Sequence, residues 1–190
     1  MANIKWALDP AHSEILFKVK HLMITTVTGH FNKFSLNVET ESEDFSTAKK
    51  IEFVAEIDSI STNNEQRDGH LKSADFFNLE KYPNLVFSGK KYEGQGDEAK
   101  LSGDLTISGI TKPITLNVEF GGIAVDPYGQ TKAGFTVAGK FNRKDFGMTW
   151  GAVTEAGNVV VSDEVKISAE IQLIKQIEQP VEAGKQAATA

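Results

Sequence analysis

The sequence contains no cysteine, and this absence removes several kinds of chemistry. Disulfides, thiolate nucleophiles and cysteine-ligated zinc sites are excluded. Long apolar runs are also missing: no segment approaches the roughly 18 residues of a spanning helix, and the opening MANIKWALDPAHS has no signal-like apolar core. We therefore expect a cytoplasmic protein without stable membrane insertion, or a periplasmic one if a leader has been removed.

Clusters of basic charge are missing as well. The chain has 190 residues with 20 Lys and Arg against 26 Asp and Glu, a net charge of -6, and its lysines are spread out. A nucleic-acid partner is therefore not expected. A hydrophobic content of 40% at this length suits one globular domain. We assign residues 1–175 to it and expect the small, polar residues 176–190 to form a flexible tail.

What the sequence has in abundance is alternation of apolar and polar residues, which is the period of a strand with one buried face. Turn-forming stretches such as EGQGD, SGITKP and DPYGQ separate the runs. About eight or nine strands are expected, at the spacing of an all-β antiparallel barrel or sandwich. The inward rows are Ile15, Phe17, Val19; Phe34, Leu36, Val38; Ile51, Phe53, Ala55, Ile57; Leu101, Gly103, Leu105, Ile107; Ile114, Leu116, Val118, Phe120; Ala133, Phe135, Val137, Gly139, Phe141; and Val165, Ile167, Ala169, Ile171, Leu173.

One segment, at about residues 63–80, breaks this alternation. Asn63 and Asn64 can cap a helix, so one or two short helices are predicted as an insert. Phe76 and Phe77 are adjacent within it. On a helix they would point about 100° apart, so that one can enter the barrel while the other packs beneath the insert.

Small residues interrupt the inward rows at Ala55, Gly103, Ala133, Gly139 and Ala169. In an eight-stranded closed sheet large side chains just fill the interior, so small ones can leave room for a long apolar ligand. Alternatively, they lie opposite phenylalanines and interdigitate with them, or mark bends. Periodicity alone does not decide between these two interpretations.

Four histidines are candidates for chemistry, and none has the spacing of metal ligands. His21 falls on the inward parity of its strand and His30 on that of the row beginning at Phe34. The two flank one connection, LMITTVTG, so we expect both near one end of the barrel. There they can be hydrogen-bonded mouth residues or contact a ligand head group. Two imidazoles fall short of a metal site. His12 is expected to make a hydrogen bond at a turn or strand end.

Two other groupings need interpretation. Serines near His12 and near His70 lack the GxSxG elbow of a nucleophile, so acyl transfer is not expected. The pairs Arg67 with Asp68 and Arg143 with Asp145 are interpreted as structural ion pairs that pin the insert and the NRKDFGMTW corner. The alternative is an arginine at the mouth that donates hydrogen bonds to a quinone carbonyl or a phosphate head. 

Several longer motifs together resemble a known family. The stretches WALDPAHSEILFKVKHL, GHFNKFS, SISTNNEQRDGHLKSADFFNLEKYPNLVFSG, LSGDLTISGITKPITLNV, GFTVAGKFNRKDFGMTW and SDEVKISAEIQL are similar, in order and spacing, to those of the YceI-like family of lipocalin-shaped polyisoprenoid-binding proteins. The resemblance covers roughly Ile4 to Leu173, and RDGHLKSADFF and RKDFGM are its most specific parts. It implies an eight-stranded antiparallel barrel with a helical insert and an elongated apolar tunnel.

The resemblance also implies a function. The protein would bind a polyisoprenoid, an isoprenoid quinone or a similar long amphiphile as a carrier or storage protein, in transport or in a stress response, and dimers occur in the family. No catalytic residue, metal or cofactor other than the bound lipid is expected. Two alternatives remain: an enzyme that acts on an amphiphile through His21, His30 and His70, or a ligand-free interaction module.

The resemblance implies site residues of two kinds. Head-group contacts would come from His21, His30, Arg67, Asp68 or His70. The tunnel would be lined by Phe17, Val19, Phe34, Leu36, Phe53, Ile57, Phe76, Leu105, Ile107, Phe135 and Phe141, with Trp150 near one end.

Overall fold

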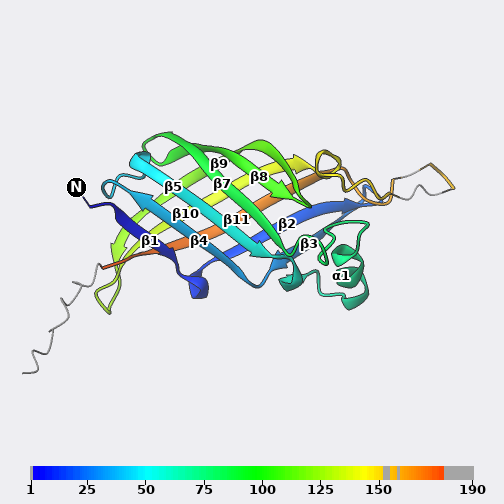
Figure 1. Cartoon of the computed structure of the whole chain (residues 1–190), viewed down its shortest axis with the longest axis horizontal. Helices are drawn as coiled ribbons and strands as arrows, with labels where there is room; N and C mark the ends of the chain where they lie inside the picture. The colour runs from blue at the N-terminus through cyan, green and yellow to red at the C-terminus, as the bar shows by residue number, and fades with distance from the viewer. Residues whose placement is uncertain (1, 152–154, 158, 178–190) are drawn as a thin grey trace, which may run out of the picture.

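The computed structural model describes residues 2–151, 155–157 and 159–177, which form strands and a single α-helix that lies at one end of the molecule (Figure 1). The predicted tail lies outside the described residues from 178 onward. The helix is α1 (Glu65–Lys72), and the 3-10 turns are η1 (Pro10–His12), η2 (Phe45–Thr47), η3 (Ile57–Ser59) and η4 (Arg143–Phe146). The strands are β1 (Ile4–Leu8), β2 (Glu14–His21), β3 (Thr25–Phe31), β4 (Phe34–Thr40), β5 (Ala48–Glu56), β6 (Ile60–Ser61), β7 (Asn84–Gln95), β8 (Glu98–Ile107), β9 (Ile110–Val125), β10 (Thr131–Asn142) and β11 (Glu164–Lys175).

Eight of these strands close into an antiparallel barrel. They pair in the order β1, β4, β5, β7, β8, β9, β10 and β11, and the pairing of β1 with β11 completes the ring. Closure leaves these strands without a free edge, and their inward rows meet at the centre. The predicted all-β, eight-stranded barrel is therefore confirmed.

The remaining strands extend one side of the barrel beyond this ring. Strand β11 pairs with β1 through residues 173–175 and with β2 through residues 166–170, so β1 and β2 lie end to end along it. Strand β3 continues β4 in the same way, and β6 follows β5 after η3. The bends at η1, residues 32–33 and η3 explain why there are more strands than alternating rows.

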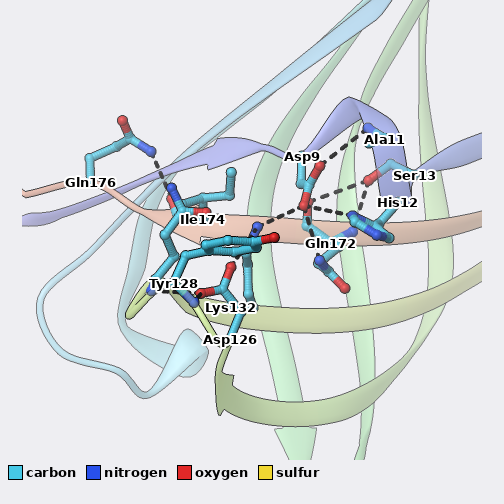
Figure 2. Close-up of polar contacts among 11 residues, drawn as sticks. Asp9, Ala11, His12, Ser13, Asp126, Tyr128, Lys132, Gln172, Ile174 and Gln176 are labelled. Carbon is cyan, nitrogen blue, oxygen red and sulfur yellow. Dashed lines mark hydrogen bonds and ion pairs between the residues drawn. The ribbon is translucent and has the colours of Figure 1, made fainter.

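The bend between β1 and β2 is fixed by a buried acid. Asp9 is 6% exposed. Its carboxylate accepts hydrogen bonds from Lys132 Nζ at 2.8 Å and Gln172 Nε2 at 3.0 Å, and lies 2.9 Å from His12 Nδ1 (Figure 2). The bond from Lys132 holds the pKa of Asp9 far below its usual range, although burial opposes this shift. The predicted turn contact of His12 is present, and Ser13 Oγ accepts a hydrogen bond from the backbone N–H of Gln172.

The segment without alternation forms α1 and the turns that follow it. The side chain of Asn64 caps α1 by accepting a hydrogen bond from the backbone N–H of Arg67 at 2.9 Å. The helix ends at Lys72, so Phe76 and Phe77 lie in turns and not on a helix. The predicted insert is thus confirmed. No helix of the described chain is long and apolar enough to cross a membrane.

An aromatic cluster of Trp6, Phe45, Phe120 and Phe135 lies inside the barrel. Trp6 belongs to β1, and Figure 1 shows β1 and α1 at opposite ends of the barrel. Ring centroids lie 4.9 Å apart for Trp6 and Phe45, and 4.8 Å apart for Phe45 and Phe135. Trp6 is 1% exposed, and its indole N–H donates to Thr40 Oγ1 at 3.0 Å. Because the buried donor is satisfied and the rings are in contact, this end is packed.

Candidate functional site

The barrel encloses an apolar cavity of about 380 Å³. This volume falls within the roughly 300–1,000 Å³ that is typical of small-molecule pockets. The wall consists almost entirely of apolar side chains, which come from strands around the barrel and from the insert. Its phenylalanines are Phe17, Phe31, Phe53, Phe76, Phe77, Phe87 and Phe141.

The cavity reaches the surface at the end of the barrel that carries α1. Lys20, His21 and Arg67 belong to its wall and are exposed to solvent. The aromatic cluster at the opposite end contributes no residue to the described wall. We call the open end the mouth and define it by Lys20, His21, Arg67, His70 and Trp150.

Most of the predicted site residues lie in the wall of this cavity. They are Phe17, Val19, His21, Leu36, Phe53, Arg67, His70, Phe76, Leu105, Phe141 and Trp150. Whether these residues contact a ligand stays a prediction. The structure places the others outside the wall: His30, Phe34, Ile57, Asp68, Ile107 and Phe135.

The four apolar residues outside the wall, Phe34, Ile57, Ile107 and Phe135, have surroundings that differ from those of the wall residues. Phe135 points inward as predicted, but it packs in the aromatic cluster 4.8 Å from Phe45. Ile57 and Ile107 are each 1% exposed in filled parts of the core, and Phe34 is only half-buried. Alternation identifies the inward face of a strand but not the level at which the interior is empty. Contrary to the prediction, these four side chains do not line the cavity.

His30 lies on the outer face of β3. Phe31 belongs to the cavity wall, and because neighbouring residues of a strand face opposite sides, His30 points away. In the hairpin of β2 and β3 it lies opposite Leu16, whereas His21 lies beside the turn. The expected meeting of His21 and His30 at the mouth is therefore wrong. The inward parity of β4, which begins at Phe34, does not extend back to β3, because the chain bends at residues 32–33.

Arg67 and Asp68 hold the insert through Thr62 and not through each other. Arg67 donates from Nε to Thr62 Oγ1 at 2.7 Å and from Nη2 to the Thr62 carbonyl at 2.8 Å. Asp68 Oδ1 accepts hydrogen bonds from the Thr62 backbone N–H at 2.8 Å and from its hydroxyl at 2.6 Å. The predicted anchoring is present, but a shared threonine replaces the predicted ion pair.

His70 connects the insert with the corner that follows β10. Its ring lies edge-on to Phe76 and Trp150, with centroid distances of 5.1 and 4.8 Å. Its Nε2 lies 2.9 Å from Asp75 Oδ2. The hydroxyl of Ser73 donates to the backbone carbonyl of His70 at 2.6 Å and does not contact the ring in this arrangement. These three residues therefore do not form the relay of a nucleophilic triad.

Arg143 organises the corner on the other side of the mouth. It is 3% exposed and donates to the backbone carbonyls of Met148 and Trp150. Burial lowers the pKa of Arg143 from its ordinary value, and Asp163, at 3.5 Å, opposes the change. Asp163 takes the place of the predicted partner Asp145. Because its donors are engaged by this corner, Arg143 positions Trp150 and is unsuited to binding a head group.

Residues 6–173 match the family model of the YceI-like domain. The chain belongs to the YceI-like domain family. It is 39% identical over 165 residues to a UPF0312 protein of Staphylococcus aureus, covering 86% of this chain and 94% of the relative. The crystal structure of the Campylobacter jejuni YceI protein is similar with a TM-score of 0.71 and 36% identity, covering 90% of this chain and 97% of that chain.

A more distant structural neighbour is a polyisoprenoid-binding domain from Saccharophagus degradans. It has a TM-score of 0.63 and 17% identity, covering 90% of this chain and 98% of that chain. At this identity the likeness concerns the fold. The YceI-like fold is therefore supported by solved structures at both higher and lower sequence identity.

Small residues contribute little to the cavity of this YceI-like barrel. A side chain at Gly103 would collide with Phe87 and the Ser88 carbonyl, and one at Gly139 would collide with Leu116, so both glycines permit close packing. Ala55 and Ala133 are fully buried outside the wall. Of the five small inward residues, Ala169 lines the cavity. Interdigitation is thus the correct interpretation for the two glycines.

Several wall residues were absent from the predicted set. Leu85 and Phe87 share one parity in the stretch NLVFSG, but Val86 between them is also apolar, so alternation gives only a weak signal for the inward face of β7. Phe77 gave no such signal, because it lies in a turn. It lines the cavity with Phe76 and meets Phe31 edge-on, with ring centroids 6.2 Å apart.

Proposed function

We propose that this YceI-like protein binds the tail of a polyisoprenoid or isoprenoid quinone in its cavity and shields it from water as a carrier or storage protein. The main observation behind this proposal is the cavity, which has an apolar wall, a mouth beside α1 and a packed opposite end. The polyisoprenoid-binding description of one structural neighbour supports the same ligand class.

The energetics of such a ligand are favourable without polar contacts. Burial of one methylene group contributes about 0.8 kcal/mol, so an isoprene unit of five carbons contributes up to about 4 kcal/mol. Association entropy and side-chain ordering offset part of this gain. Since apolar burial is non-directional, affinity should rise with tail length and depend weakly on the head group.

The polar groups at the mouth are suited to orienting a head group. Arg67 uses Nε and Nη2 on Thr62, and Nη1 has no hydrogen bond to the residues that the structure describes. The ring of His70 is held by Asp75 and two aromatic side chains. We propose that these groups orient the ligand and perform no catalysis, because Ser73 Oγ donates to the His70 backbone carbonyl and no other hydroxyl among the described residues is hydrogen-bonded to the His70 ring.

The experiment is mass spectrometry of an organic extract of the purified protein, combined with uptake of added farnesol and of a longer isoprenoid quinone. We expect co-purified lipid or saturable uptake, with tighter binding of the longer chain. Absence of both lipid and uptake would contradict the proposal. Turnover of the bound compound that is abolished in His70→Ala, with binding retained, would favour an enzyme.

A further inference from the structure

The turn between β2 and β3 has an unusual composition for its backbone. Leu22 and Met23 have positive φ values of 51° and 61°, and the backbone N–H of Ile24 donates to the His21 carbonyl at 3.1 Å. Positive φ at both central residues with this hydrogen bond is typical of a type I′ turn. Such turns favour Asn and Gly, because larger side chains are strained at positive φ. Both residues are therefore strained here, and Met23, whose side chain is largely exposed, gains little packing in return, whereas Leu22 is half-buried.

The same turn presents apolar side chains to solvent. Met23 is 57% exposed, Ile24 76% and Val159 41%. The backbone N–H of Leu22 donates to the Val160 carbonyl at 2.9 Å, and His21 pairs with Val161, so Val159 lies next to this turn. We call Met23, Ile24 and Val159 the tip patch. Its side chains are exposed in a place where the turn itself would favour polar residues.

The tip patch is continuous with the mouth of the cavity. Val160 directly follows Val159, and His21 and Val161 lie two residues from the patch in sequence. All three line the cavity. Figure 1 shows β2, β3 and α1 at the same end of the molecule. An apolar surface therefore leads from the exposed turn into the apolar interior.

Charge around the tip patch differs in sign from the chain as a whole. Residues 15–31 include Lys18 and Lys20 but no acidic residue, although the net charge of the chain is -6. At the start of the adjacent strand β11, Asp163 lies 3.2 Å from Lys144 and Glu164 lies 3.6 Å from Lys140. These two carboxylates thus have basic partners other than the hairpin lysines, and Glu155 is the acidic residue in the described part of the segment that carries Val159. The hairpin lysines are therefore available to anionic head groups.

We propose that the tip patch inserts into the interface of an anionic phospholipid bilayer, so that the mouth opens onto the membrane surface. Exposed apolar side chains flanked by lysine suit this interface, where the apolar groups enter the acyl boundary and the cations meet lipid head groups. The use of this contact for loading a lipid rests on the proposed function, whereas the contact itself rests on the hairpin. A symmetric contact between the hairpins of two copies would cover the apolar side chains, but it would bring lysines together, because residues 15–31 contain no acidic residue.

The opposite end of the barrel supplies a matched control. Val125 and Tyr128, beside the turn between β9 and β10, are 67% and 90% exposed. In that turn Asp126, drawn with Tyr128 in Figure 2, accepts hydrogen bonds from the backbone N–H groups of Tyr128 and Gln130. Gly129 occupies the position with positive φ, which is the residue type that such a position favours. It has comparable exposure but no connection to the cavity.

The test measures co-sedimentation of the full chain with vesicles of phosphatidylcholine alone or mixed with phosphatidylglycerol. We expect binding to the anionic vesicles that weakens with salt, and a loss of roughly tenfold or more in Met23→Gly/Ile24→Thr. Val125→Thr/Tyr128→Thr should bind as the wild type does. Because glycine relieves the strain at residue 23, the tip variant should keep or raise its thermal midpoint, so that lost binding does not reflect unfolding.

Uptake of farnesol from solution separates this inference from the proposed function. We expect uptake to be unchanged in the tip variant. If the wild-type protein takes up farnesol but does not bind anionic vesicles, the membrane contact is refuted and the proposed function stands. An equal loss of vesicle binding in the control variant would overturn it as well. Vesicle binding without uptake of any isoprenoid would support the contact and refute the proposed ligand. A concentration-dependent dimer that dissociates in the tip variant, without vesicle binding, would assign the patch to a second copy.

Discussion

Ala169→Leu should separate the effect of the cavity on stability from its effect on binding. Ala169 lies on β11 in the cavity wall, is 7% exposed and pairs with Ile15 and Val137. Leucine adds three carbons to an existing void. At about 0.8 kcal/mol per buried methylene, the lipid-free protein should gain up to about 2.4 kcal/mol of stability. A lipid that loses the same space should bind roughly 60-fold more weakly.

Ala133→Leu provides the matched comparison. Ala133 also points inward, but it is fully buried outside the cavity wall. The same substitution should overpack the core and lower stability by about 1–3 kcal/mol. Differential scanning calorimetry of lipid-free protein would measure stability, and quenching of tryptophan fluorescence by an isoprenoid quinone would measure affinity.

Two results would refute this reasoning. If Ala169→Leu is destabilised as much as Ala133→Leu, the space beside Ala169 is not available to a side chain. If Ala169→Leu is stabilised but binds the quinone with unchanged affinity, the ligand lies outside this cavity. For the reasoning to hold, Ala169→Leu must raise the stability of the lipid-free protein and weaken its binding of the quinone.

Two further predictions concern the polar anchors. Because the pKa of Asp9 is depressed in the folded protein, its carboxylate contributes stability above its ordinary pKa of 3.8, and the contribution is lost as the pH falls toward the folded value. Asp9→Asn should cost about 3 kcal/mol at neutral pH, and urea denaturation should show this difference shrinking below about pH 4; a pH-independent difference would contradict it. Thr62→Val should cost about 2 kcal/mol and accelerate amide exchange in α1, whereas Thr136→Val on the exposed face should not; unchanged exchange in α1 would refute the anchoring role of Thr62.

Much of the architecture could be predicted from local sequence. The row from Leu101 to Ile107 alternates because one face of β8 is buried, and this pattern depends only on neighbours along the strand. The insert was recognisable because residues 63–80 lack that pattern. Anchoring by Arg67 and Asp68 was anticipated, but their shared partner Thr62 was not, since a residue five or six positions away can meet a helix in many ways.

Two phenylalanines of one strand show where sequence stops being sufficient. Phe135 and Phe141 share the inward face of β10, so alternation treats them alike. In the barrel Phe135 packs against Phe45 from η2, whereas Phe141 lines the cavity. The sequence by itself determined the β-rich class, the inward faces and the family. Only the tertiary structure decided which inward side chains meet empty space and where the mouth lies, because a void depends on how closely side chains from distant strands approach one another.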